Sequence, residues 1–138
     1  MSELSTDVRI FISSTFIDLK ELREEIASRL REVFGARLLI METFGSDEAP
    51  PEISSLRKVR ESDVFIGIYA RRYGTVDVTT GKSITELELD EAERTLSAGN
   101  LMAILLYWLA DDANWPARFC EKDAVAIRRL SSCEFRKI

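Results

Sequence analysis

A glutamate at the predicted start of a helix is a candidate for chemistry in this chain. It is Glu86 of the segment Ser83-Ile84-Thr85-Glu86, which precedes a run of apolar residues at helical spacing. A carboxylate that faces a cleft can attack a sugar carbon, or stabilise the cation that forms when a glycosidic bond breaks. The same residues fit a capping box, in which Ser83 and Glu86 bind only backbone N–H groups. The sequence leaves both interpretations open.

The geometry of this helix does not decide which carboxylate matters. Its expected apolar stripe consists of Thr85, Leu89, Ala92 and Leu96. At roughly 100° per residue, Glu86 and Glu88 flank the stripe on opposite sides. We therefore expect one of them to border a cleft and the other to face solvent.

Two further loops could complete a site. The segment Ala70-Arg71-Arg72-Tyr73-Gly74 combines two arginines, which can hold phosphates, with a ring that can stack on a base. The segment Ser13-Ser14-Thr15 offers hydroxyl and N–H groups at a helix start, although it lacks both common glycine-rich phosphate motifs. The alternatives are a solvated turn anchored by Tyr73, and local capping by Thr15 and Asp18.

Four predicted strands position these loops. They span Val8–Ile12, Arg37–Met41, Val64–Tyr69 and Leu101–Leu109, and helices are predicted at about 19–33, 52–61, 83–97 and 115–130. Strands that alternate with helices indicate an α/β fold, here three α-β-α layers around a short parallel sheet of four to five strands. Ligands of such sheets bind beyond the carboxyl ends of the strands, where the strand order reverses. The tail 135–138 resembles the start of a further strand, as in a piece of a longer protein.

Apolar periodicity predicts which residues are buried. One stripe on the first helix consists of Leu19, Leu22, Ile26, Leu30 and Val33. The strand Val64–Tyr69 is nearly all apolar, as expected for a strand covered on both faces, and so we predict that Phe65 is buried. The apolar run Leu101–Leu109 is predicted as a fourth buried strand.

The amino-acid composition argues against several classes of binding site. A net charge of -5 gives no support for a nucleic-acid surface, which would need clustered Lys and Arg. The absence of His removes the usual general base and the commonest zinc ligand, and we expect no metal site. Cys120 and Cys133 fit reduced thiols of a cytoplasmic protein. The longest apolar run is about half the length needed to span a bilayer, so we expect no membrane segment.

Three motifs, in the same order along the chain, resemble one known family. They read VRIFISSTFIDLKELREEI, ESDVFIGIYARRYGTVD and GKSITELELDEA. They are similar to the domain-of-unknown-function family number 4062, found at the N-termini of STAND-type NTPases and related defence or signalling proteins. The resemblance covers about residues 7–109 and is less clear after Trp108. It implies one TIR-like domain over residues 1–138, with a flavodoxin-like arrangement, at the N-terminus of a longer protein.

The resemblance also implies roles for individual residues. Relatives among TIR domains and nucleoside deoxyribosyltransferases use a Glu at the start of the helix after the third strand for N-glycosidic chemistry, and Glu86 matches that place. By the same matching, Ser13 and Ser14 lie in the nucleotide-side loop. Arg71, Arg72, Tyr73 and Gly74 lie in the loop that closes over the ligand.

Three functions follow as hypotheses. The first is an effector in defence signalling that cleaves an N-glycosidic bond, with NAD as a substrate rather than a cofactor and Glu86 as the catalytic residue. The second is a non-enzymatic module that associates with itself or with an attached NTPase domain. The third is a nucleotide sensor without turnover. The co-occurrence of Ser14, Arg71, Tyr73 and Glu86 at strand ends favours an enzyme. An interaction module would not need these residues to converge on one cleft, and their placement on separate faces would favour it.

Overall fold

The protein is described by a computed structural model that covers residues 7–35, 38–41 and 51–130. Its described strands are β1 (Val8–Ser13), β2 (Leu38–Met41), β3 (Val64–Tyr69) and β4 (Ala103–Trp108). They form one parallel sheet in the order β2-β1-β3-β4. The predicted α/β class and parallel sheet are confirmed. The first strand is one residue longer than predicted, because Ser13 pairs with Gly67 of β3.

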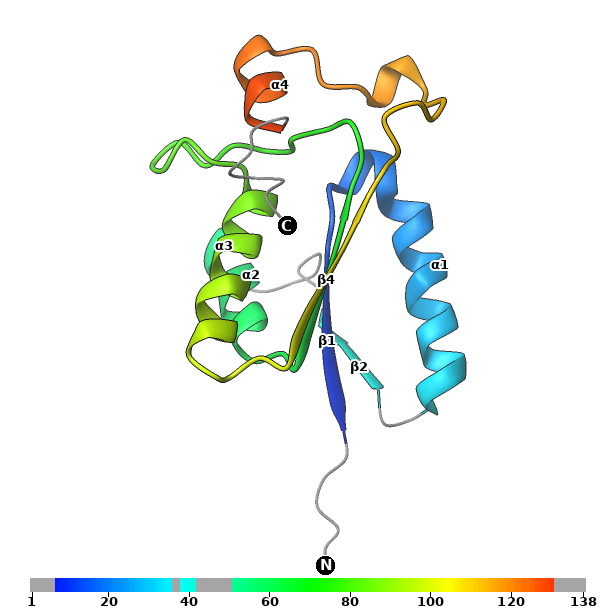
Figure 1. Cartoon of the computed structure of the whole chain (residues 1–138), viewed down its shortest axis with the longest axis vertical. Helices are drawn as coiled ribbons and strands as arrows, with labels where there is room; N and C mark the ends of the chain where they lie inside the picture. Colours follow the sequence, from blue (N-terminus) through cyan, green and yellow to red (C-terminus); the bar gives the residue numbers. More distant parts are fainter. Residues whose placement is uncertain (1–6, 36–37, 42–50, 131–138) are drawn as a thin grey trace, which may run out of the picture.

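The helices cover both faces of this sheet (Figure 1). They are α1 (Phe16–Phe34), α2 (Pro51–Arg60), α3 (Ile84–Ser97) and α4 (Ala124–Leu130). On the α1 side the core contains Ile10, Ile12, Leu19, Ile66 and Ile68. On the α2 and α3 side it contains Phe11, Val59, Phe65, Leu89 and Ala92. Because alternate strand residues point to opposite faces, β1 and β3 each contribute to both cores, and the three-layer arrangement follows.

The buried stripe of α1 differs from the predicted one. Leu19 is 2% exposed and the other fully buried positions are Arg23 and Ala27, whereas Leu22 is 44% exposed and Val33 is 76% exposed. Ile26 and Leu30 are partly buried against the same core. The positions i, i+4 and i+8 from Leu19 therefore face the sheet, and one of them is an arginine that a search for apolar residues could not detect.

The last two predicted elements also need correction. β4 pairs on one side only among the described strands, and Leu105 and Tyr107 are 43% and 58% exposed, so it is not a buried strand. The predicted helix 115–130 is interrupted. A short 3-10 helix spans Ala117–Phe119, and α4 begins only at Ala124, where the Asp123 carboxylate accepts the Ala126 N–H at 2.9 Å. Residue Cys133 and the tail 135–138 lie outside the described residues.

Candidate functional site

The candidate site lies where β1 and β3 end, which is the point of reversal in the strand order. The loop after β3 is held against the loop after β1 by Gly74, which has a φ of +98°. A Cβ atom at Gly74 would lie 3.1 Å from the Thr15 methyl group and 3.4 Å from the Thr85 hydroxyl. The absence of a side chain therefore lets the Tyr73 loop reach the start of α3.

Glu86 lies in a cluster of three polar side chains at this start. Its backbone N–H donates to the Ser83 hydroxyl at 3.1 Å, so half of the predicted capping box is present. Its carboxylate, however, does not accept the backbone N–H of Ser83, which donates to the Tyr73 hydroxyl instead. It accepts a hydrogen bond from the Tyr73 hydroxyl, and Arg129 of α4 donates to it through Nε at 2.8 Å and through Nη2 at 2.5 Å.

Burial makes this cluster a strong electrostatic unit. Glu86 is 3% exposed and Tyr73 is 2% exposed, so the ion pair with Arg129 is shielded from water on the carboxylate side. The hydrogen bonds that Arg129 donates to Glu86 raise the pKa of Arg129. Burial, followed by the hydrogen bond to Glu86, raises the pKa of Tyr73. The Tyr73 hydroxyl also accepts the Ser83 N–H at 3.1 Å, which fixes its position.

Glu88 is the centre of a second buried cluster. It is 5% exposed and receives hydrogen bonds from the Ser13 hydroxyl, at 2.7 Å, and from the Ser55 hydroxyl of α2. Burial raises its pKa from 4.5 to about 7, although both serine hydroxyls and the charge of Arg23 act against that shift. The expectation that one of the two carboxylates faces solvent is therefore wrong, because α2 covers the side of α3 that carries Glu88.

Tyr69 extends this second cluster across the sheet. Its ring lies over Gly67, whose hypothetical Cβ would be 2.7 Å from the Tyr69 Cζ atom. Burial raises the Tyr69 pKa, and a hydrogen bond with Ser13 opposes that increase. Ser13 thus connects Tyr69 with Glu88. Neighbouring Ser14 is 7% exposed, and within the described part of the chain its hydroxyl has no hydrogen-bond partner.

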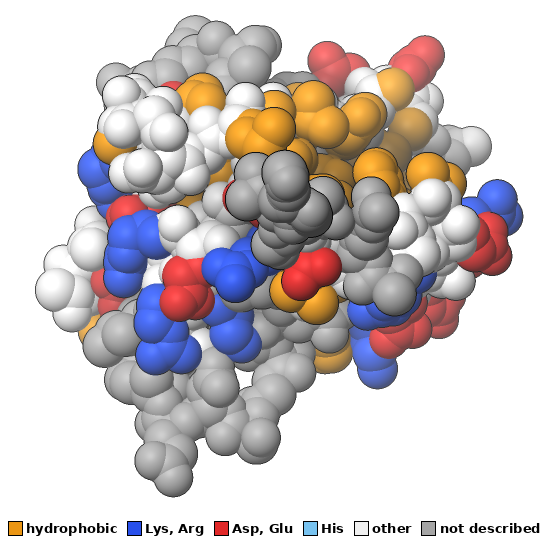
Figure 2. All heavy atoms as spheres, turned by 90° about the horizontal axis from the view of Figure 1, so that it is seen from below, with side chains coloured by type: hydrophobic (Ala, Val, Ile, Leu, Met, Phe, Trp, Pro, Cys, Tyr) orange, Lys and Arg blue, Asp and Glu red, His pale blue; other side chains and the backbone are white. Residues whose placement is uncertain are grey.

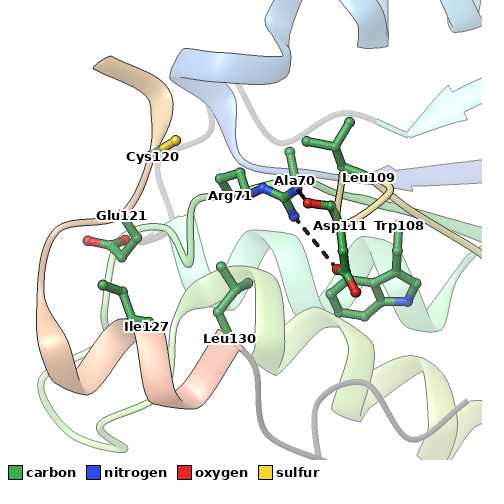
Figure 3. Close-up of a pocket in the computed structure, with 9 residues that line it drawn as sticks. All are labelled: Ala70, Arg71, Trp108, Leu109, Asp111, Cys120, Glu121, Ile127 and Leu130. Carbon is green, nitrogen blue, oxygen red and sulfur yellow. Dashed lines mark hydrogen bonds and ion pairs between the residues drawn. The ribbon is translucent and has the colours of Figure 1, made fainter. Parts of the chain in front are cut away.

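Arg71 is directed away from Glu86, toward the loop after β4. Its Nη2 atom donates to the carbonyl oxygens of Ala110 and Asp111 at 2.7 and 2.9 Å, which ties the loop after β3 to the loop after β4. It lines a cavity of about 250 Å³ beside α4 (Figure 3). The other residues around this cavity are Ala70, Trp108, Leu109, Asp111, Cys120, Glu121, Ile127 and Leu130.

The predicted site residues therefore converge only in part. Tyr73 meets Glu86 and Ser13 meets Glu88, whereas Arg71 is directed toward the end of β4. Arg72 is half-buried and has no hydrogen bond or ion pair with either carboxylate in the segments the structure describes. The predicted cap by Thr15 is also absent, because its hydroxyl bonds the Asp18 carboxylate rather than a backbone N–H group.

Sequence reasoning missed Arg129 and Ser55 as partners of the two carboxylates. Arg129 is 43 residues from Glu86, and Ser55 is 33 residues from Glu88. Only one signal was available, namely the serine pair Ser54-Ser55 at positions of α2 that turn out to be fully buried.

In residues 7–35, 38–41 and 51–130, no group of three or more Cys, Asp or Glu side chains could hold a metal ion. The helices within these ranges are too short or too polar to cross a bilayer.

Comparison with known proteins places the chain in a family. No curated protein matches it. A family model described as "Domain of unknown function (DUF4062)" matches residues 9–133, which confirms the predicted resemblance and extends it beyond Trp108. Because this match covers most of the 138 residues, the chain belongs to the DUF4062 family.

Proposed function

We propose that this domain cleaves an N-glycosidic bond of NAD or a related nucleotide, with Glu86 as the catalytic carboxylate. The observation that carries the proposal is the placement of two buried carboxylates, Glu86 and Glu88, on one helix at the carboxyl ends of β1 and β3. Their surroundings differ: one carboxylate meets a guanidinium group, and the other meets two hydroxyls and has a pKa of about 7. Such divergent pairs are typical of acid–base sites.

The proposed reaction is a hydrolysis. The bond between C1′ and the base nitrogen breaks, and its electron pair stays with the base. Water adds to C1′, and its proton goes to a neutral base or, when the base was cationic as in NAD, to solvent. Glu86 stabilises the positive charge that develops on the ribose, either electrostatically or by attack on C1′. Glu88 exchanges a proton at neutral pH through the Ser13 hydroxyl that it contacts.

The test of this function is the release of free base. The full chain is incubated with NAD and with a set of nucleosides at pH 7, and the products are separated by chromatography. We expect free base and the corresponding sugar or ADP-ribose to appear in equal amounts. If none of these compounds is cleaved, the proposed activity is contradicted.

A protein-binding role is the second candidate, because apolar side chains are exposed along β4. Met102 is 78% exposed, and Leu105 and Tyr107 follow on the edge strand. Hydrophobic side chains also gather on the face of the molecule seen in Figure 2. Exposed apolar patches beside an edge strand are typical of interaction surfaces. For self-association through β4, we expect sedimentation to show a dimer that Leu105→Lys converts to a monomer; a wild-type monomer at all concentrations would exclude it.

A further inference from the structure

The ion pair between Arg129 and Glu86 has a consequence for the proposed chemistry. A carboxylate that receives two N–H groups from a guanidinium has its charge largely compensated. Compensated in this way, Glu86 cannot stabilise a positive charge on a sugar. Turnover by Glu86 therefore requires that Arg129 first moves to another partner.

Arg129 is the accessible member of this pair. Its side chain is 31% exposed, whereas the side chain of Glu86 is 4% exposed. An anion that arrives from solvent can thus contact the guanidinium without first reaching the carboxylate. The two parallel N–H groups that now hold Glu86 match the oxygens of a phosphate equally well.

Within the described segments, only a small part of the helix that carries Arg129 is buried. α4 has seven residues, and Ala126 is its only fully buried one, packed against Tyr69 and Tyr73. Val125 and Ile127 are 64% and 43% exposed. The cavity of about 250 Å³ is lined by Ile127 and Leu130 of α4 and by residues at the ends of β3 and β4 (Figure 3). A short helix above a cavity can move without disrupting the sheet or its two cores.

We propose that Arg129 is the anion-binding residue of this site, and that it exchanges Glu86 for the phosphate of a nucleotide substrate. Binding of the phosphate releases the Glu86 carboxylate, so the site acts on phosphorylated nucleotides in preference to nucleosides. This inference rests on the proposed function for its catalytic part. The exchange itself is a binding equilibrium, which can be measured without turnover.

The test is calorimetric titration of the full chain with inorganic pyrophosphate. Glu86→Gln removes the competing charge, so we expect this variant to bind pyrophosphate more tightly than the wild type, by about tenfold for one charge-assisted contact. Arg129→Gln should lose binding by at least the same factor. Arg128→Gln is the matched control, because Arg128 precedes Arg129 on α4 and its side chain is exposed. We expect this variant to bind pyrophosphate as tightly as the wild type does.

The pyrophosphate titrations and the base-release assay test the exchange and the proposed hydrolysis independently. Equal affinities in the wild type, Glu86→Gln and Arg129→Gln would overturn the exchange, as would weaker binding by Glu86→Gln. Should Arg129→Gln fail to fold, the gain in Glu86→Gln still decides the question. If the affinities follow the expected order but no base is released from any nucleotide, only the proposed hydrolysis fails. If base is released but the pyrophosphate affinities do not follow the expected order, only the exchange fails.

Discussion

At the scale of residues, the same side-chain type has two roles within one turn of helix. Glu86 forms an ion pair with the guanidinium group of Arg129. Glu88 accepts hydrogen bonds from two serine hydroxyls, and its pKa of about 7 reflects the cost of removing a carboxylate from water, which the charge of Arg23 offsets only in part. The chemistry of each glutamate is therefore decided by the element packed against it rather than by its own position on α3.

The raised pKa of Glu88 predicts how the free energy of unfolding depends on pH. Its pKa is about 7 in the folded protein, above the ordinary value of 4.5, so the folded state binds the proton more tightly. The contribution of Glu88 to the free energy of unfolding is then greatest below pH 4.5 and falls as the pH rises to about 7. The total fall is on the order of 3 kcal/mol. We expect Glu88→Gln to remove this decrease in denaturant titrations between pH 4.5 and pH 8.

The control for that measurement is Glu24→Gln on α1, because Glu24 is exposed. It should leave the pH profile of the wild type unchanged. A Glu88→Gln profile that coincides with the wild-type profile would show that Glu88 is ionised across this range.

Gly67 is a second residue with a testable consequence. A Cβ atom there would lie 2.7 Å from both the Tyr69 Cζ atom and the Leu106 Cδ2 atom, so both side chains, or the backbone between them, would have to move. We expect Gly67→Ala to lower the free energy of unfolding by about 1–3 kcal/mol, because the well-packed core cannot accept an added methyl group. Denaturant titration measures the change, and an unchanged midpoint would mean that Tyr69 does not lie over Gly67.

At the scale of elements, β1 and β3 were predictable because both are covered on two faces and consist of continuous apolar runs. The register of α1 was not predictable in the same way. Leu22 and Leu19 are equally apolar, and only the direction in which the helix crosses the sheet selects Leu19. α4 was misplaced because residues 115–130 satisfy a helical pattern, whereas the Asp123 cap starts the helix late.

A pair of substitutions tests the register of α1. Leu19→Ala should cost about 2–5 kcal/mol, because Leu19 is 2% exposed and its loss leaves a cavity. Leu22→Ala should cost less than about 1 kcal/mol, because Leu22 is 44% exposed. Ile26→Ala should lower the free energy of unfolding by an intermediate amount, because Ile26 is only partly buried. Denaturant midpoints provide the comparison, and a larger loss from Leu22→Ala than from Leu19→Ala would contradict the observed register.

At the scale of the whole molecule, the site combines residues that are distant in the sequence. The placement of Ser13, Tyr73 and Glu86 at one end of the sheet was predictable, because each follows or faces the carboxyl end of a strand and parallel strands bring these ends together. Arg129 and Ser55 were not, because no local pattern encodes a contact across 43 or 33 residues. The site is thus an outcome of the complete topology, with α4 closing it from the carboxyl ends of the strands (Figure 1).

The measurement that tests the central claim most directly is the rate at which free nicotinamide is released from NAD by the wild type and by Glu86→Gln. Gln keeps nearly the same shape and its backbone N–H can still donate to Ser83, so the variant should fold. It lacks the negative charge, and we therefore expect its rate to fall by roughly a hundredfold or more while Glu24→Gln keeps the wild-type rate. Release by Glu86→Gln at the wild-type rate would contradict the account.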